Sequence, residues 1–274
     1  MPVDIVHREE ETQPSSLTDR RDRWWIEPTL VVIALVLFVC YSTFRAFENN
    51  FFETRDLIEK GFSNIAPFYI SPFYSPYIPW KLPIGSYTLS PALYILVFPL
   101  SFRLTCYYCR KSYYRSFFMD PPACSVQEPV ARKNYKGERE FPFIMQNLHR
   151  FALYAAIIII IFLVKDLYEA FFYKDAAGVT HFGMGVGTLL FLIDVVLVSA
   201  YTFSCHSLRH LIGGAVNCFS CSSAAKTRYL LWRIVSKLNE RHALWFWTSL
   251  LTVASSDLYV RFVSAGIIRD FRFF

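Results

Sequence analysis

Five long apolar segments limit what this chain can fold into more than any other feature of its sequence. A helix needs about 20 mostly apolar residues to cross roughly 30 Å of hydrocarbon. The segments that reach this length cover residues 28–47, 88–108, 148–172, 185–213 and 242–266. The second is the weakest, because Pro91 and Pro99 interrupt it and Arg103 lies near its end. We therefore predict an all-α membrane protein, built as a bundle of five transmembrane helices.

Positive charge differs strongly between the two sides of the predicted bundle. Sixteen Lys and Arg residues lie in the N-terminal tail and in the two loops on its side, and six lie on the opposite side. Because Lys and Arg accumulate on the cytoplasmic side of a membrane, we predict a cytoplasmic N-terminus and a C-terminus outside. The formal net charge of +6 then reflects topology, and we do not expect nucleic-acid binding.

The predicted organisation is one membrane domain over residues 28–266 with a short tail at each end. The first 27 residues are polar and show no cleavable signal peptide, so the first span is expected to stay as an anchor. The tails and connections are a cytoplasmic tail 1–27, an outer segment 51–87, cytoplasmic loops 109–147 and 214–241, and an outer tail 267–274. The loop over residues 214–241 is basic and is expected to form an amphipathic surface helix that docks a soluble subunit.

The outer segment is rich in proline and aromatic residues. Residues 62–80 contain four prolines and seven aromatic side chains. Proline removes a backbone donor and fixes φ, so a regular spanning helix is excluded. We expect the segment to lie along the outer surface and cap the bundle, either as an interfacial aromatic belt or as a lid over a lipid or quinone pocket.

Two short motifs carry metal-ligand chemistry. Cys106 and Cys109 end one predicted span, and His206 and His210 end another, both on the cytoplasmic side. Residues three or four apart share one face of a helix, so each pair presents two ligands in one direction. Two Cys and two His suit a tetrahedral zinc site or a Rieske-type 2Fe–2S cluster. A haem would instead use His149 with His206 or His210.

Three other cysteines, Cys205, Cys218 and Cys221, are not expected to bind a metal. Cys218 and Cys221 form a second CxxC motif, which arises easily by chance among seven Cys. Six of the seven lie at or near the reducing face, so we expect no disulfides. Cys205 lies about 100° around the helix from His206 and is expected to pack against another span.

Several segments resemble the membrane subunit of haem-free succinate dehydrogenases, of the actinobacterial and mycobacterial type. The segments are Leu-Thr-Cys-Tyr-Tyr-Cys-Arg-Lys at 104–111, Pro-Pro-Ala-Cys at 121–124, Phe-Pro-Phe-Ile-Met-Gln-Asn-Leu-His-Arg at 141–150, Phe-Gly-Met-Gly-Val-Gly-Thr at 182–188 and Tyr-Thr-Phe-Ser-Cys-His-Ser-Leu-Arg-His-Leu-Ile-Gly-Gly at 201–214. The resemblance covers roughly residues 90–265. It implies a multi-pass protein of the bacterial inner membrane.

The resemblance also implies a function. The chain would anchor respiratory complex II, with a flavoprotein and an iron–sulfur subunit on the cytoplasmic face. A Rieske-type 2Fe–2S cluster and no haem would then carry electrons from succinate to menaquinone, linking the tricarboxylic acid cycle to the respiratory chain. Lipids and a small accessory membrane subunit are further expected partners. By the family pattern the ligands would be Cys106, Cys124, His206 and His210, with Cys109 as the alternate.

Other polar residues near these ligands are candidates for quinone and proton chemistry. Quinone sites combine an apolar slot with a few donors to the carbonyl oxygens. The candidate donors are Tyr107, Tyr108, Arg110, His149, Arg150, Arg209 and Trp232. Asp194, in the middle of a span, either relays protons or pairs with Lys165, and Asp257 and Arg261 are expected to neutralise each other.

Two rival classes stay open on the residues alone. A membrane scaffold or transporter with a structural zinc would contain zinc and no iron. A b-type cytochrome would show a Soret band and use His149 as a ligand. Each differs from the iron–sulfur hypothesis in metal content and visible spectrum.

Overall fold

The computed structural model describes residues 23–79, 82–84, 87–118 and 143–274. The helices are α1 (Ile26–Glu48), α2 (Pro91–Ile95), α3 (Val97–Thr105), α4 (Tyr107–Phe118), α5 (His149–Glu169), α6 (Val186–Phe203), α7 (His206–Gly213), α8 (Ser223–Asn239) and α9 (His242–Ser264). Two 3₁₀ turns, η1 (Pro72–Tyr74) and η3 (Phe143–Leu148), complete the helical elements. The strands are β1 (Ile65–Pro67), β2 (Leu82–Ile84), β3 (Tyr87–Leu89), β4 (Phe172–Asp175) and β5 (Thr180–Phe182).

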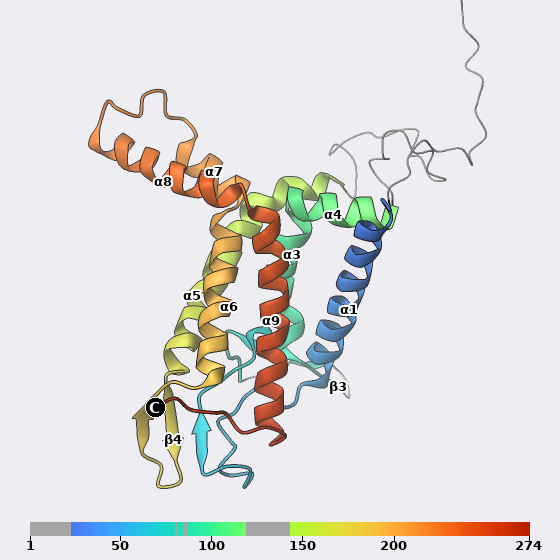
Figure 1. The fold of residues 1–274 in the computed structure, drawn as a ribbon, viewed down its shortest axis with the longest axis vertical. Coiled ribbons are helices and arrows are strands. Elements are labelled where there is room, and N and C mark those ends of the chain that lie inside the picture. Colours follow the sequence, from blue (N-terminus) through green and yellow to red (C-terminus); the bar gives the residue numbers. More distant parts are fainter. Residues whose placement is uncertain (1–22, 80–81, 85–86, 119–142) are drawn as a thin grey trace, which may run out of the picture.

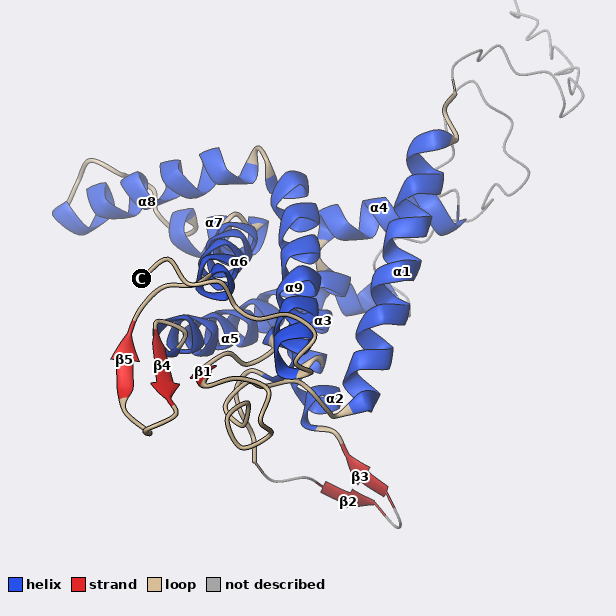
Figure 2. Ribbon diagram, turned by 60° about the horizontal axis from the view of Figure 1, so that its bottom comes forward, coloured by secondary structure: helices blue, strands red, loops and turns tan. Residues whose placement is uncertain are grey.

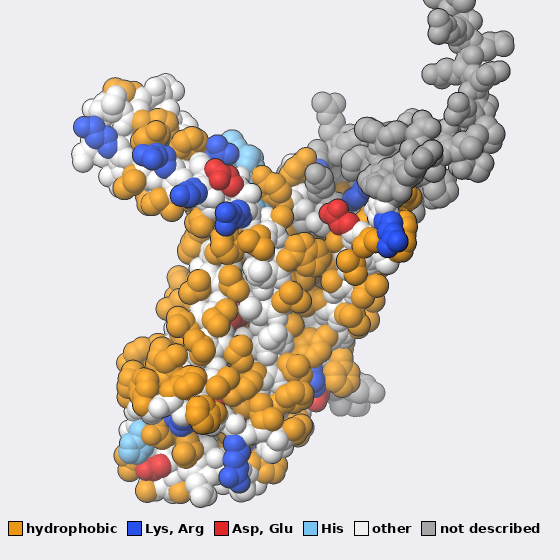
Figure 3. Space-filling model, viewed as in Figure 1, with side chains coloured by type: hydrophobic (Ala, Val, Ile, Leu, Met, Phe, Trp, Pro, Cys, Tyr) orange, Lys and Arg blue, Asp and Glu red, His pale blue; other side chains and the backbone are white. Residues whose placement is uncertain are grey.

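Helices α1, α3, α5, α6 and α9 run side by side along the long axis of the molecule (Figure 1). Apolar side chains cover most of the surface of this bundle, whereas Lys and Arg gather towards its two ends (Figure 3). Among the described residues, three helices are long and apolar enough to cross a membrane: α1, the helix over Ile144–Glu169, and α6. A fourth is added if α2–α3 and α4 are taken together as one broken span.

The predicted five-span topology is therefore supported only in its helical, membrane-type character. Helix α9 has 23 residues and lies among the other long helices (Figure 1). Buried Ser249, Ser256, Asp257 and Arg261 occupy its interior face, which lowers its apolar content. The number of crossings and the orientation of the termini remain predictions.

Two of the predicted spans are broken where a cysteine occurs. Cys106 ends α3 in an extended conformation, with ψ 128°, and α4 leaves at 74° to the preceding helix. Cys205 is also extended, with ψ 138°, and its sulfur accepts a hydrogen bond from the backbone N–H of Ser207 at the start of α7. The predicted spans 88–108 and 185–213 therefore each consist of bundle helix followed by a separate helix directed away from the axis. The end of the bundle where these breaks lie, with α4, α7 and α8, is called the Cys end below.

The opposite end, called the hairpin end, carries all five strands (Figure 2). Strands β1, β4 and β5 form an antiparallel sheet in the order β1-β4-β5, and β2 pairs with β3 separately. The centre of the predicted outer segment does not lie on the surface: Tyr69, Ile70, Phe73 and Tyr74 are each at most 2% exposed. Because η1 packs against α2 and α9, these side chains fill the hairpin end of the core and do not form an interfacial belt.

Close packing leaves no room for a side chain at two glycines, Gly185 directly before α6 and Gly187 in its first turn. A Cβ on Gly187 would lie 2.3 Å from the Tyr69 ring, and one on Gly185 would lie 2.2 Å from a carboxylate oxygen of Asp270. Both distances are shorter than real Cβ contacts allow. The start of α6 therefore packs directly against a loop tyrosine and the C-terminal tail.

Candidate metal and quinone site

A buried cluster of cysteine and histidine side chains lies at the Cys end. Cys106 and Cys109 are each 2% exposed and Cys205 is fully buried. The thiols of Cys106 and Cys109 lie close enough to each other to interact. Because the chain turns at Cys106, the two thiols meet across a helix break, and not on one continuous helix as the sequence predicted.

His242, the first residue of α9, joins this cluster. Its Nε2 lies 3.3 Å from the Cys106 sulfur, and its Nδ1 lies 2.6 Å from the Ser204 hydroxyl. The ring is 1% exposed and stacks on Tyr201 with 5.0 Å between ring centres. One nitrogen of the imidazole is therefore fixed by a hydroxyl, while the other faces a thiol.

His149, the first residue of α5, is held in the same way. Its Nδ1 lies 2.9 Å from the Thr105 hydroxyl, and its Nε2 lies 3.0 Å from the Cys205 sulfur. The ring stacks on Phe102, with centres 4.8 Å apart. Cys205 does pack against another span, as predicted, and the group that it touches is a histidine.

The predicted histidine pair lies at the edge of this cluster. His206 and His210 are on one face of α7, with their Nε2 atoms 3.0 Å apart, and both rings are exposed. His206 lines a pocket together with Cys106 and His149, whereas His210 lines a neighbouring one. Cys124, the predicted second thiolate, lies outside the described residues.

The first of these pockets gathers most of the predicted quinone donors. It has a volume of about 220 Å³, and its wall includes Thr105, Cys106, Tyr107, Tyr108, Arg110, Gln146, Asn147, His149, His206 and Ser207. Four of the seven candidates, Tyr107, Tyr108, Arg110 and His149, therefore share one cavity with a thiol of the cluster. We call it the Cys106 pocket.

The other three candidates lie elsewhere. Arg209 and Trp232 line the neighbouring pocket of about 290 Å³ with His210, Gly213 and Gly214. The guanidinium carbon of Arg209 lies 5.1 Å from the centre of the Trp232 ring, which is a cation–π contact. Arg150 is exposed on α5 and lines neither of these two pockets.

Asp194 is buried in the middle of the bundle, 1% exposed. Thr252 of α9 and Arg103 of α3 are the polar groups that lie close enough to act on its carboxyl. Its Oδ1 has no hydrogen-bond partner among the described residues. Lys165 pairs instead with Glu169 at 2.9 Å, so the predicted alternative of an Asp194–Lys165 pair is wrong.

Arg103 links Asp194 to the cysteine cluster. Its guanidinium carbon lies 4.6 Å from the centre of the Tyr201 ring, and the Tyr201 hydroxyl lies 3.2 Å from the Cys109 sulfur. Arg103 also donates to the backbone carbonyl of Phe246 at 3.2 Å and to the Ser249 hydroxyl at 3.0 Å. Arg103 therefore lies between Asp194, on which its charge acts, and the Tyr201 ring beside Cys109.

One member of the cluster, His242, was not predicted from the sequence, where it is a lone histidine at the predicted start of a span. His149 was predicted for quinone or haem only, and Cys205 for packing only. The available signal was positional: His149 and His242 begin predicted spans at the end where Cys106 lies, and Cys205 directly precedes His206.

The types of side chain in this cluster suit a metal ion, although their arrangement in the structure does not. Among the described residues, no group of three or more Cys, His, Asp and Glu side chains is arranged to hold a metal ion. The chemistry of the donors nevertheless fits a centre with mixed sulfur and nitrogen ligands, since three thiols and two imidazoles are buried together. Hydroxyls fix the far nitrogen of each imidazole, which is how metal-ligating histidines are usually oriented.

One cysteine prediction is wrong. Cys218 and Cys221 form a disulfide, with Cα atoms 5.7 Å apart, whereas the sequence analysis expected no disulfides. The two cysteines are three residues apart in the loop between α7 and α8. They take no part in the buried cluster.

Comparison with known proteins identifies the family. Residues 26–266 match the family model described as "Actinobacterial succinate dehydrogenase subunit SdhC". The chain is also similar to a chain of the Mycobacterium smegmatis Sdh1 complex in the apo form, with 38% identity, 98% of each chain covered and a TM-score of 0.80. Among curated proteins, none matches the chain. The chain belongs to the actinobacterial SdhC family and is a membrane-anchor subunit of succinate dehydrogenase, the respiratory complex II.

Proposed function

We propose that this subunit holds a Rieske-type 2Fe–2S cluster at the Cys end and passes electrons from succinate oxidation to menaquinone. The observation that carries the proposal is the burial of Cys106, Cys109, His149 and His242 together, with a pocket beside them. A bound 2Fe–2S cluster supplies one-electron transfer. Succinate itself would be oxidised on another chain.

The proposed thiolate ligands are Cys106 and Cys109, and the proposed imidazole ligands are His149 and His242. This keeps Cys106 from the sequence prediction and promotes the alternate, Cys109, since its thiol touches that of Cys106. The buried histidines are preferred over His206 and His210 because each already directs one nitrogen to a thiol. Two thiolates and two imidazoles are the ligand set of a Rieske-type centre.

The Cys106 pocket is the proposed menaquinone head-group site. Tyr107 and Tyr108 supply ring surface and hydroxyls, and Arg110 and His206 supply N–H donors within the same wall. These groups suit a planar ring with two carbonyl oxygens, whereas the isoprenoid tail would follow the apolar surface of the bundle. His206 is assigned here to the quinone, and Arg209 and Trp232 to the neighbouring surface of α7 and α8.

Asp194 is the proposed proton-exchanging group. Reduction of a quinone to a quinol takes up two electrons and two protons, so protons must reach the site through the protein. A buried carboxyl with one oxygen free of hydrogen bonds, within the field of Arg103, can accept and release a proton inside the bundle.

Helices α7 and α8 are the proposed contact for the soluble subunits, in an inner bacterial membrane with the Cys end cytoplasmic. They project from the side of the bundle (Figure 1). Helix α8 combines Lys226, Arg228, Arg233 and Lys237 with exposed Leu230 and Ile234. A basic and apolar surface of this kind suits an iron–sulfur subunit that in turn carries the flavoprotein.

Electron paramagnetic resonance of the reduced, purified complex tests the metal centre. We expect a Rieske-type signal in the wild-type complex and its absence in Cys106→Ser and His242→Ala variants. Metal analysis and a visible spectrum of the same sample separate the rivals, since a structural zinc gives no iron and a b-type cytochrome gives a Soret band. A wild-type complex without the Rieske-type signal would refute the proposal.

A further inference from the structure

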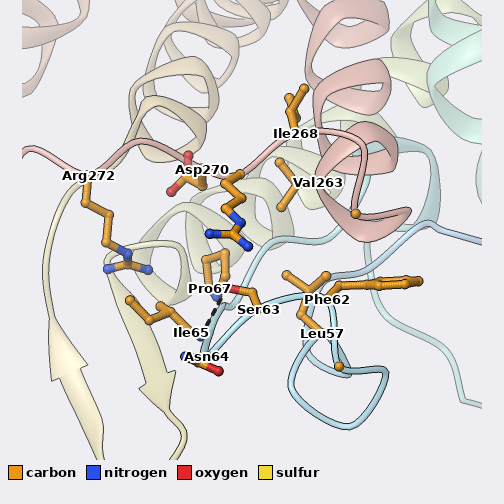
Figure 4. A pocket seen from close by; sticks show the side chains of 13 residues that line it. Leu57, Phe62, Ser63, Asn64, Ile65, Pro67, Val263, Ile268, Asp270 and Arg272 are labelled. Carbon is orange, nitrogen blue, oxygen red and sulfur yellow. Dashed lines mark hydrogen bonds between the residues drawn. The ribbon is translucent and has the colours of Figure 1, made fainter.

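A polar pocket lies at the hairpin end, far from the cysteine cluster. It has a volume of about 350 Å³ and is bounded by the loop over residues 57–67, the end of α9 and the C-terminal tail (Figure 4). One wall is apolar, with Leu57, Phe62, Val263 and Ile268. The other carries Asn64, Arg269, Asp270 and Arg272.

The one carboxylate of this wall is already satisfied by other donors. Asp270 accepts hydrogen bonds from the Tyr69 hydroxyl at 2.8 Å, the Tyr259 hydroxyl at 2.7 Å and the Gly187 backbone N–H at 3.0 Å. Figure 4 shows its side chain turned towards the helix ends, whereas Arg272 extends towards Ile65 and Asn64. Asp270 thus anchors the tail and does not neutralise the neighbouring arginines.

The two arginines have no carboxylate partner within the part of the chain that the structure describes. The ion pairs found there involve Arg45, Arg55, Lys60, Lys165, His181 and Arg261. Arg272 stacks on Tyr173, with its guanidinium carbon 3.4 Å from the ring centre. This fixes the plane of the guanidinium while leaving its N–H edge for an acceptor. Arg269 is exposed at the mouth of the pocket.

Exposed apolar side chains of the C-terminal tail lie next to the pocket. Ile267, Phe271, Phe273 and Phe274 are all more than half exposed. In the extended tail Phe271 and Phe273 alternate with Arg272, so the aromatic rings and the guanidinium leave the backbone on opposite sides. Exposed aromatic rings beside arginines are typical of the level of lipid head groups. The pocket therefore faces the place where phospholipids are available.

We propose that this pocket binds the phosphate head group of an anionic phospholipid. Arg269 and Arg272 bind the phosphodiester through charge-assisted hydrogen bonds. Asn64 lies in the same wall and offers a neutral amide donor. The apolar wall of Leu57, Phe62, Val263 and Ile268 receives the beginning of an acyl chain. The proposal concerns the hairpin end alone, so it does not depend on the proposed metal centre or quinone site.

The experiment compares lipid binding by the purified, complete succinate dehydrogenase complex and by its Arg269→Gln/Arg272→Gln variant. Native mass spectrometry counts bound phospholipids, and the thermal midpoint is followed in phosphatidylglycerol or phosphatidylcholine. We expect phosphatidylglycerol to bind wild-type complex at least about tenfold more tightly than it binds the double variant, since one lost charge-assisted contact already accounts for that difference and the variant removes two. Binding of phosphatidylcholine should change little.

The matched control is an Arg55→Gln/Lys174→Gln variant, which also removes two positive charges. Arg55 lies beside Glu169 at the end of α5 and Lys174 lies in β4, and neither residue lines the pocket. This control should retain phosphatidylglycerol as the wild type does. If the control lost as much phosphatidylglycerol binding as the Arg269→Gln/Arg272→Gln variant, the proposal would be overturned. Wild-type binding in the Arg269→Gln/Arg272→Gln variant would overturn it as well. A third arm adds inorganic phosphate, and displacement of the lipid by low millimolar phosphate would overturn the assignment to a membrane lipid. Unchanged succinate oxidation in both variants verifies that the complex is assembled.

Discussion

The two ends of the bundle bury polar groups of different chemistry. At the hairpin end the buried groups are charged and satisfy one another: Asp257 pairs with Arg261 at 2.8 Å and accepts from Tyr41 at 2.6 Å and from Ser71. Arg261 also reaches Glu48 at 2.9 Å. At the Cys end the buried groups are thiols and imidazoles, which hydrogen-bond weakly to each other but ligate metals strongly. The first arrangement is complete in itself, whereas the second is the one that the proposed metal centre would complete.

The largest effect is expected for a substitution of Cys106 at the Cys end. Cys106→Ser replaces the thiol that contacts both Cys109 and His242. We expect loss of the Rieske-type signal and a fall in succinate:quinone activity of more than about 100-fold, because losing a ligand exceeds the usual cost of losing its supporting contacts. Quinone reduction by the purified complex measures the effect. Cys218→Ser is the control, and a similar fall in that variant would contradict the assignment.

The hairpin end is tested through its buried ion pair. Arg261→Met leaves the Asp257 carboxylate buried without its cation and should destabilise the subunit by about 3–5 kcal/mol. We expect poor assembly of the complex, measured as the yield of intact complex and its thermal midpoint. The double variant Asp257→Asn/Arg261→Met removes both charges and should recover much of the yield. If the single variant assembled as well as wild type, this network would not be what stabilises the hairpin end.

The choice between the two histidine pairs sharpens the comparison further. His242→Gln removes a buried ring that contacts Cys106, and we expect loss of the metal centre and, with it, of most of the quinone activity. His210→Gln changes an exposed ring and should leave the iron content of the complex unaltered. Iron analysis and electron paramagnetic resonance of the two variants decide the matter. The reverse outcome would restore the pair on α7 as the ligands.

The smallest effect is expected for the carboxyl between the two ends. Asp194→Asn preserves the shape of the side chain but cannot carry a proton. Quinone turnover should fall about tenfold, less than the roughly 100-fold typical of a group that acts in the chemical step itself, because Asp194 would exchange protons at a distance; the iron–sulfur signal should stay intact. Steady-state activity and spectroscopy on one sample provide both readouts. Unchanged turnover would reduce Asp194 to a packing role.

Much of this fold could be predicted from the sequence, because helix length and apolar composition are local properties. The first, third and last predicted spans coincide closely with α1, α5 and α9. The expected neutralisation of Asp257 by Arg261 is confirmed. The breaks at Cys106 and Cys205 could not be predicted, since both lie inside apolar runs and depend on where α4 and α7 pack. The buried centre of the outer segment was missed for the same reason: its aromatic and proline content fits a membrane surface as well as a core.

The candidate site was predicted only in its location. Spans that return to one side had to bring their terminal cysteines and histidines together, and they do so for Cys106, Cys109 and His149. Which imidazoles face which thiols depends on side-chain packing between four helices. That arrangement could not be obtained from the spacing of residues along one helix.

The helix breaks at Cys106 and Cys205 also have a consequence for biogenesis. Once α4 and α7 have turned across the end of the bundle, the thiols of Cys106, Cys109 and Cys205 are at most 2% exposed. A carrier protein cannot reach sulfur atoms that are shielded to this degree. A metal centre held by these thiols must therefore be delivered before the two helices close. Loading would then be a step in the maturation of the subunit, and a chain that closed without its metal would have to reopen to be repaired.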